Sequence, residues 1–277
     1  MEKLEILYWK RWRCKIEEKY MFWLLCSLQK LDSSLYSKFE VSFGSIKEMY
    51  EISNNSLKFK QILIKNKMFF SNEVINKLVS SKLKIQSEKL LNIIHNMNIK
   101  IQKVKINDKY LYTFVYGNTN LLKCTRKKLY IFCDNNTSKY GIEKCKYFLN
   151  CKNVKENINV CIGSKNIKKN SCNISIVNIE NVSELRTIEI ERLDINNLYI
   201  FSLYNIICML TIADVILIPE AKYTSYSNTL VSNFLDFGKD ILVIPGDIWD
   251  KNCFFSNFLI REGANVILNI NDLNIFL

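Results

Sequence analysis

The stretch that decides the fold is residues 212–264, IADVILIPEAKYTSYSNTLVSNFLDFGKDILVIPGDIWDKNCFFSNFLIREGA. It contains two short runs of apolar residues. The first run, Asp214–Pro219, is apolar almost throughout, which is typical of a strand buried on both faces of a sheet. The second run, Ile241–Ile244, has the same character and is stopped by Pro245-Gly246. Both runs therefore predict central strands.

The residues between these runs have the pattern of an amphipathic helix. Ser225 and Ser227 are suited to cap its start, and Gly238 is placed to end it just after Phe237. A strand, a helix and a strand of these lengths predict a parallel crossover unit. In such sheets the ligand crevice lies in the loops that follow the carboxyl ends of the strands. We expect the functional site in the loops after these two strands.

Five short motifs in this stretch resemble the DNA-processing protein A (DprA, also called Smf) family, in the family's order. They are Pro219-Glu220-Ala221, Ser225-Tyr226-Ser227, Gly238-Lys239-Asp240, Ile244-Pro245-Gly246 and Asn257-Phe258-Leu259-Ile260-Arg261-Glu262-Gly263-Ala264. The resemblance implies a Rossmann-like domain that binds single-stranded DNA and loads a RecA-type recombinase. It also implies a homodimer formed through that domain.

The chain departs from the family at other positions. A glycine–serine–arginine motif of the family falls on Cys133, Asp134 and Asn135, although the Tyr140-Gly141 pair that follows is retained. Without the arginine, a fixed phosphate clamp is missing. About nine residues follow Gly163 before the next apolar run, fewer than the dozen or so that a crossover helix needs. We therefore expect that helix to be missing or reduced to a turn.

The sequence predicts two domains: a helical domain over residues 1–96, similar to small helix-hairpin-helix or SAM domains, and a Rossmann-like domain over 97–277. The turn Phe43-Gly44-Ser45 resembles one in the family's N-terminal domain, and a single helix is predicted over Val74–Asn96. The hairpin Lys30–Ser34 has no glycine, so its backbone is poorly suited to approach a phosphate. We expect a protein contact or a spacer role for this domain.

The positive charge is concentrated in one part of the chain. The net charge is +12, and Lys123–Lys169 contributes 12 basic and 3 acidic residues, a net +9. The segment from Asn178 to the end has 6 basic and 13 acidic residues, a net −7. A polarised charge favours one surface for a polyanion. The alternative is a solvated surface that is rich in lysine for reasons of composition alone.

Cysteine and histidine usage argues against a metal site. The ten cysteines include no C-x-x-C pair, and His95 is the only histidine. We expect no metal, no cofactor and no obligatory disulfide, so that chelator and reductant leave thermal stability unchanged. No apolar run reaches the roughly 18 residues of a membrane span, which favours a cytoplasmic protein.

The candidate DNA-binding residues are lysines beside the expected crevice and polar residues of the motifs. They are Lys127, Lys128, Lys139, Lys165, Lys168, Lys169, Ser225, Ser227, Gly246 and Asn257. Single-strand binders combine such cations with aromatic side chains on which bases stack. Tyrosines 130, 140, 147, 223 and 226 are near the crevice or its flanks, and we expect more than half of them to be packing residues.

Two other functions stay open. One is a nucleotide-processing enzyme on a related fold, although the glycine-rich phosphate loop it needs is absent and no catalytic residues can be assembled around one distant histidine. The other is a diverged DprA paralogue that acts as a protein-interaction module without DNA binding. A helix expected over Phe254–Ile260 carries enough aromatic surface for a dimer contact, or it is an ordinary core helix.

Overall fold

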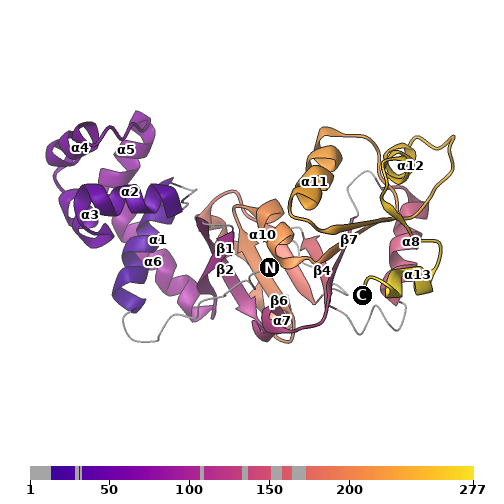
Figure 1. Ribbon diagram of the computed structural model, residues 1–277. Coiled ribbons are helices and arrows are strands. Elements are labelled where there is room, and N and C mark those ends of the chain that lie inside the picture. The colour runs from indigo at the N-terminus through magenta and orange to yellow at the C-terminus, as the bar shows by residue number, and fades with distance from the viewer. Residues whose placement is uncertain are drawn as a thin grey trace. The chain divides into compact units, whose positions relative to one another are not determined.

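The computed structural model describes residues 14–28, 31, 33–106, 109–132, 137–150, 158–163 and 173–277. The chain divides into two compact units (Figure 1). Unit 1 comprises Met1–Tyr116, Ile179–Glu191 and Phe201–Leu203, and unit 2 comprises Gly117–Asn178, Arg192–Ile200 and Tyr204–Leu277. Both units are discontinuous in sequence. The domain boundary expected after residue 96 stays a prediction.

Unit 1 is built mainly from helices around an aromatic core. Its elements are α1 (Cys14–Leu28), α2 (Ser33–Phe43), α3 (Ile46–Ile52), α4 (Ser56–Lys65), α5 (Asn72–Val79), α6 (Ser81–Asn96), the antiparallel hairpin β1 (Lys100–Ile106) and β2 (Lys109–Gly117), and the 3-10 helix η1 (Val182–Thr187). Trp23, Phe22, Phe39 and Phe59 are fully buried. A short 3-10 helix η2 (Ile190–Arg192) follows η1.

The helix boundaries of unit 1 are set by serine caps. The turn at Gly44 has φ +86°, and the Ser45 side chain accepts from the Glu48 amide to start α3, as the sequence predicts. The single helix predicted over Val74–Asn96 is wrong. Ser80 is extended (φ −75°, ψ 112°), and its hydroxyl accepts from the Leu83 amide, so α5 ends there and α6 begins.

Unit 2 is a mostly parallel sheet with helices. Its strands are β3 (Lys128–Ile131), β4 (Ile158–Gly163), β5 (Ile174–Asn178), β6 (Leu198–Ser202), β7 (Val215–Ile218), β8 (Asp240–Val243) and β9 (Asn265–Val266). They lie in the order β6-β5-β4-β3-β7-β8-β9, and the pairs from β5 to β9 are parallel. The chain thus builds the sheet outward from β3 in one direction and later from β7 in the other. The α/β, Rossmann-like fold class is confirmed.

The helices of unit 2 are α7 (Asn120–Lys123), α8 (Lys139–Asn150), α10 (Asn205–Ile212), α11 (Ser225–Asp236), α12 (Phe254–Arg261) and α13 (Ile270–Asn274). One hydrophobic cluster joins Leu129, Leu217 and Leu242 of three adjacent strands to Phe148 of α8 and Leu273 of α13. The strands at the centre are buried on both faces, which explains why their sequences are continuously apolar.

Candidate nucleic-acid interface

The order of strands changes direction between β3 and β7, which pair in parallel with Leu129 opposite Val215. In doubly wound sheets this switch point opens a crevice at the carboxyl ends of the two strands. The residues that meet there come from the start of α8 and from the loop between β7 and α11 (Figure 1). The loop after β7, one of the two loops in which the sequence predicts the site, therefore lies at the switch point of the sheet.

A buried carboxylate occupies the switch point. Glu220 is only 2% exposed, and it accepts from the Ser138 amide (2.8 Å) and from the Ser138 hydroxyl (2.6 Å). Gly141 donates its amide to the same hydroxyl (3.1 Å). A Cβ on Gly141 would lie 2.7 Å from Glu220 Oε2, so the close approach of α8 to this carboxylate requires glycine. The glycine of the Tyr140-Gly141 motif therefore leaves the space that the Glu220 carboxylate occupies against α8.

The loop after β8 is held by an amide side chain. Gly246 donates its amide to Asn257 Oδ1 (3.1 Å), and Asn257 Nδ2 donates to the Gly246 carbonyl (3.2 Å). A Cβ on Gly246 would overlap the Sγ of the buried Cys253. Burial raises the pKa of the Cys253 thiol, which opposes formation of a nucleophilic thiolate there. Gly246 and Asn257 therefore fix the shape of the loop.

Two further contacts brace the loops against each other. The Ala221 amide donates to Ser256 Oγ (2.8 Å), and the Phe255 amide donates to the Ala221 carbonyl (3.0 Å). Lys144 Nζ lies 3.3 Å from the Pro219 carbonyl and 3.5 Å from the Pro245 carbonyl, and it sits over the Tyr140 ring. The loops after β7 and β8 are consequently fixed to α8 and α12.

The start of α11 differs in detail from the sequence prediction. The N-cap is Thr224, whose side chain accepts from the Ser227 amide, while the Ser227 hydroxyl accepts from the Thr224 amide. Ser227 also donates to the Lys222 carbonyl (2.8 Å) and is buried. Ser225 is the first helical residue and is exposed. The Thr-x-x-Ser capping box could have been found in the sequence.

Four of the five candidate tyrosines are exposed. They are Tyr140, Tyr147, Tyr223 and Tyr226. Tyr130 is buried and stacks on Phe234, and the rings of Tyr147, Tyr223 and Tyr226 also contact phenylalanine rings. The expectation that more than half of the tyrosines are packing residues stays a prediction. Tyr226 stacks on Phe132 at the end of β3 (ring centroids 6.3 Å), and Tyr223 packs edge-on against Phe255. Aromatic faces are thus available on both sides of the start of α11.

The candidate lysines are not all at this edge of the sheet. Lys139 is exposed at the start of α8, beside the switch point. Lys127 and Lys128 lie at the amino end of β3, and at about 3.3 Å per residue the strand separates them from its carboxyl end by roughly 10–13 Å. There the Lys128 amide donates to Asp214 (2.9 Å). Lys165, Lys168 and Lys169 lie outside the described residues.

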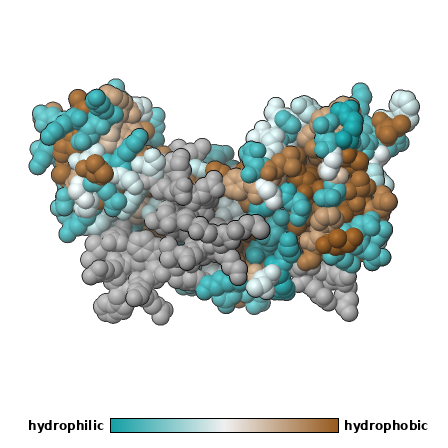
Figure 2. All heavy atoms as spheres, in the orientation of Figure 1, coloured by the Kyte–Doolittle hydropathy of each residue, from teal (hydrophilic) through white to brown (hydrophobic). Residues whose placement is uncertain are grey.

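The predicted dimer helix has one exposed aromatic end. Phe255 is 1% exposed and belongs to the core, whereas Phe254 is 62% exposed. Figure 2 shows hydrophobic side chains gathered on the visible face of unit 2. A Phe255→Asp variant would therefore report on folding, and Phe254 is the residue with which to test a contact through α12.

The described residues contain no group of three or more His, Cys, Asp or Glu side chains that could hold a metal ion. The cysteines whose side chains are described, Cys26, Cys124, Cys145, Cys161, Cys208 and Cys253, are free thiols. Within the same part of the chain, no helix is long and apolar enough to cross a membrane. His95 lies in unit 1, 3.3 Å from Glu18, so it is not a residue of this site.

The fold and the site define a doubly wound α/β protein with a braced switch point. No family model and no curated sequence matches the chain. Its structure is similar to that of DNA processing protein A (DprA) from Streptococcus pneumoniae, with a TM-score of 0.50 and 15% identity over 83% of this chain and 96% of that chain. DprA from Helicobacter pylori, described for its single-stranded DNA binding mode, matches with a TM-score of 0.48 and 16% identity over 64% of this chain and 95% of that chain. At 15% identity, the similarity to the Streptococcus pneumoniae structure shows the fold alone.

Proposed function

We propose that this chain is a DprA-like DNA-processing protein that binds single-stranded DNA at the switch point of unit 2. The similarity to the pneumococcal DprA structure supports this proposal, as do the five motifs between Pro219 and Ala264. The principal observation is the exposure of Tyr223 and Tyr226 at the start of α11 and of Tyr140 at the start of α8, on a braced frame. Such rings suit base stacking, which is independent of sequence.

Ser227, Gly246 and Asn257 serve this function indirectly in our proposal. Their polar atoms hold the loops, so the direct contacts come from the tyrosines, Ser225 and Lys139. The α11 N-terminus adds a partial positive charge that favours phosphate. Lysines supply attraction without the fixed geometry of the absent arginine, so binding is weak and steeply dependent on salt.

The finer parts of the proposal follow from the family resemblance. They are loading of a RecA-type recombinase, a homodimer through unit 2, a cytoplasmic location and the absence of catalysis. For the homodimer, sedimentation at tens of micromolar should give a dimer, and Phe254→Asp should shift it to a monomer because Phe254 is exposed. Leu235→Asp, at an exposed position of α11, is the control for added surface charge. A wild type that remains monomeric contradicts the dimer.

The test is a binding isotherm with labelled oligo-dT at two salt concentrations. Tyr223→Ala and Tyr226→Ala should each weaken binding by about tenfold, the loss expected for one stacked base. Replacing Lys165, Lys168 and Lys169 together by alanine should flatten the log–log salt slope by roughly 2, at about 0.7 per phosphate contact. The control is Lys127→Ala/Lys128→Ala, since those lysines lie at the other end of β3.

The outcomes separate the alternatives. If the tyrosine variants bind oligo-dT as well as the wild type does, the DNA site does not lie at the switch point. If the control weakens binding as much as the tyrosine variants, the strand instead follows the amino edge of the sheet. No binding at low salt favours a protein-interaction module, whereas hydrolysis of a nucleoside monophosphate would indicate an enzyme.

A further inference from the structure

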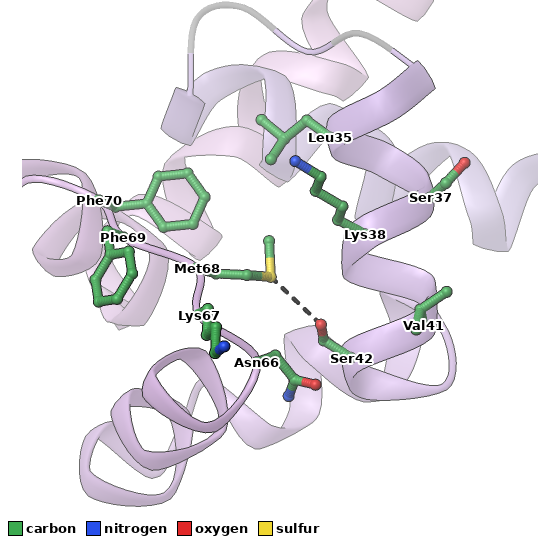
Figure 3. A pocket seen from close by; sticks show the side chains of 10 residues that line it. All are labelled: Leu35, Ser37, Lys38, Val41, Ser42, Asn66, Lys67, Met68, Phe69 and Phe70. Carbon is green, nitrogen blue, oxygen red and sulfur yellow. Dashed lines mark hydrogen bonds between the residues drawn. The ribbon is translucent and has the colours of Figure 1, made fainter.

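A groove of about 630 Å³ opens in unit 1 between α2 and the turn that follows α4 (Figure 3). Its volume is in the range of ligand-binding pockets, about 300–1,000 Å³. The apolar lining comes from Leu35 and Val41 on α2 and from Met68, Phe69 and Phe70 beyond α4. All of its lining residues belong to unit 1, so the groove does not depend on the switch point.

The floor of the groove is part of the core of unit 1 and is therefore preformed. Phe70 stacks on the buried Phe39 (ring centroids 5.7 Å, interplanar angle 17°). Met68 is buried, and the Ser42 hydroxyl donates to its sulfur (3.3 Å), as the dashed line in Figure 3 marks. A preformed floor lowers the ordering cost of binding, and a methionine can adapt to the side chain that enters.

The rim carries apolar side chains that the described residues of unit 1 leave exposed. Val41 is 85% exposed and Phe69 is 82% exposed. Removing such side chains from water favours the complex. They stand on opposite sides of the groove, one on α2 and the other beyond α4, as anchors on the two walls of a binding site would.

The charged side chains that line the groove have one sign, although α2 also carries Glu40 outside the lining. Lys38 and Lys67 line it, and among its lining residues, all of which the structure describes, there is no aspartate or glutamate. The α4 helix, which leads into the groove, adds Lys58, Lys60 and Lys65 and contains no acidic residue. Lys67 has φ +53°, a left-handed conformation that costs a non-glycine residue about 1 kcal/mol. A lysine thus occupies a position at the rim whose left-handed backbone conformation glycine adopts more easily.

We propose that this groove binds a segment of a partner protein that carries acidic residues around one or two large apolar anchors. The anchors would enter between Val41 and Phe69, and the carboxylates would face Lys38 and Lys67. Residues 1–13 of the chain itself carry four basic and two acidic side chains, so their charge does not match the groove. A nucleic acid would leave the aliphatic lining of Leu35, Val41 and Met68 without a partner.

Selection of random 12-residue peptides displayed on phage, with the full chain as target, tests this proposal. Selected peptides should contain several Asp or Glu residues and at least one large apolar residue. Their affinity, measured by fluorescence anisotropy, should fall at least about tenfold for Val41→Ala/Phe69→Ala. A similar loss is expected for Lys38→Glu/Lys67→Glu. The matched control is Leu57→Ala/Ile64→Ala, two exposed apolar residues of α4 that do not line the groove.

Unchanged circular dichroism establishes that each variant is folded, which is expected because the substituted side chains are exposed. The proposal is overturned if no peptide is selected, if the selected peptides lack acidic residues, or if the groove variants bind them as well as the control does. Loss of oligo-dT binding in the Lys38→Glu/Lys67→Glu variant would assign the groove to nucleic acid and would also overturn it.

Discussion

Among the described residues, each unit has one buried charged side chain, and the two are stabilised in different ways. Glu220 in unit 2 is 2% exposed, and Lys84 in unit 1 is 4% exposed. Glu220 has two hydrogen bonds from Ser138 and holds α8 against the loop after β7. Lys84 Nζ donates to the Tyr50 carbonyl (2.6 Å) and to Asn54 Oδ1 (2.8 Å), and it lies 4.2 Å from the centre of the Tyr50 ring.

The difference lies in the balance of charge and desolvation. Among the described residues no carboxylate pairs with Lys84; Glu88 pairs with Lys19 instead (2.6 Å). Burial, aided by the charge of Lys19, lowers the pKa of Lys84 from 10.5 to about 8. The lowered pKa means that the fold opposes the charged form of Lys84. The comparison indicates that Glu220 strengthens the frame of the proposed DNA site, whereas protonated Lys84 weakens unit 1 at neutral pH.

The largest effect is expected from Glu220→Ala. The substitution leaves the Ser138 amide and hydroxyl without their acceptor inside the fold and opens a cavity, so the free energy of unfolding should fall by about 3 kcal/mol. Urea denaturation of the full chain measures this loss. The control is Glu262→Ala, whose exposed pair with Arg261 should contribute less than about 0.5 kcal/mol. Equal losses in both variants would mean that Glu220 does not hold the frame.

A pH series tests the other side of the comparison. The folded-state pKa of Lys84 lies below its unfolded value, so above pH 8 the unfolded chain binds more protons and stability rises with pH. Between pH 7 and pH 9.5 this contributes about 2 kcal/mol to the free energy of unfolding. Lys84→Met should abolish that rise and stabilise the chain at pH 7. Measurements stop below pH 10, since burial raises the pKa of Tyr50 and this opposes the trend there.

Burial also raises the pKa of the Cys26 and Cys253 thiols, whose contributions to stability fall over the same pH range, so the test is the difference between wild type and Lys84→Met. A difference in the free energy of unfolding that does not change with pH would contradict this explanation. Lys89→Met, at an exposed position of the same helix, is the matched control for removing one lysine from α6.

The smallest effect concerns the helix caps of the two units. Thr224→Ala removes a reciprocal capping box at the proposed DNA site and should cost about 1 kcal/mol. Ser71→Ala removes a single exposed cap from α5 in unit 1 and should cost about half as much. Urea denaturation gives both values. If the order is reversed, the capping box adds nothing to an ordinary cap.

The sequence predicted the frame of unit 2 well because buried parallel strands are continuously apolar. β7, α11 and β8 were all expected, whereas the pairing of β3 with β7 that makes the switch point was not. The roles of Ser227 and Asn257 could not be predicted, since a polar side chain in a motif has the same letter whether it faces a ligand or a loop carbonyl. The break at Ser80 was missed because serine is tolerated inside helices and the hydrophobic pattern continues across it.

The division of the chain between the units has a consequence for how the protein is made. Ile179–Glu191 belongs to unit 1, and its 3-10 helix η1 places Val182 and Leu185 in buried positions there. The ribosome reaches Val182 several seconds after Tyr116, at about 5–20 residues per second. The helices of unit 1 are therefore synthesised before Ile179–Glu191, and they lack this segment while the first strands of unit 2 are made. A chain truncated after Tyr116 would also lack Ile179–Glu191, and it would expose the surface of unit 1 that Val182 and Leu185 cover.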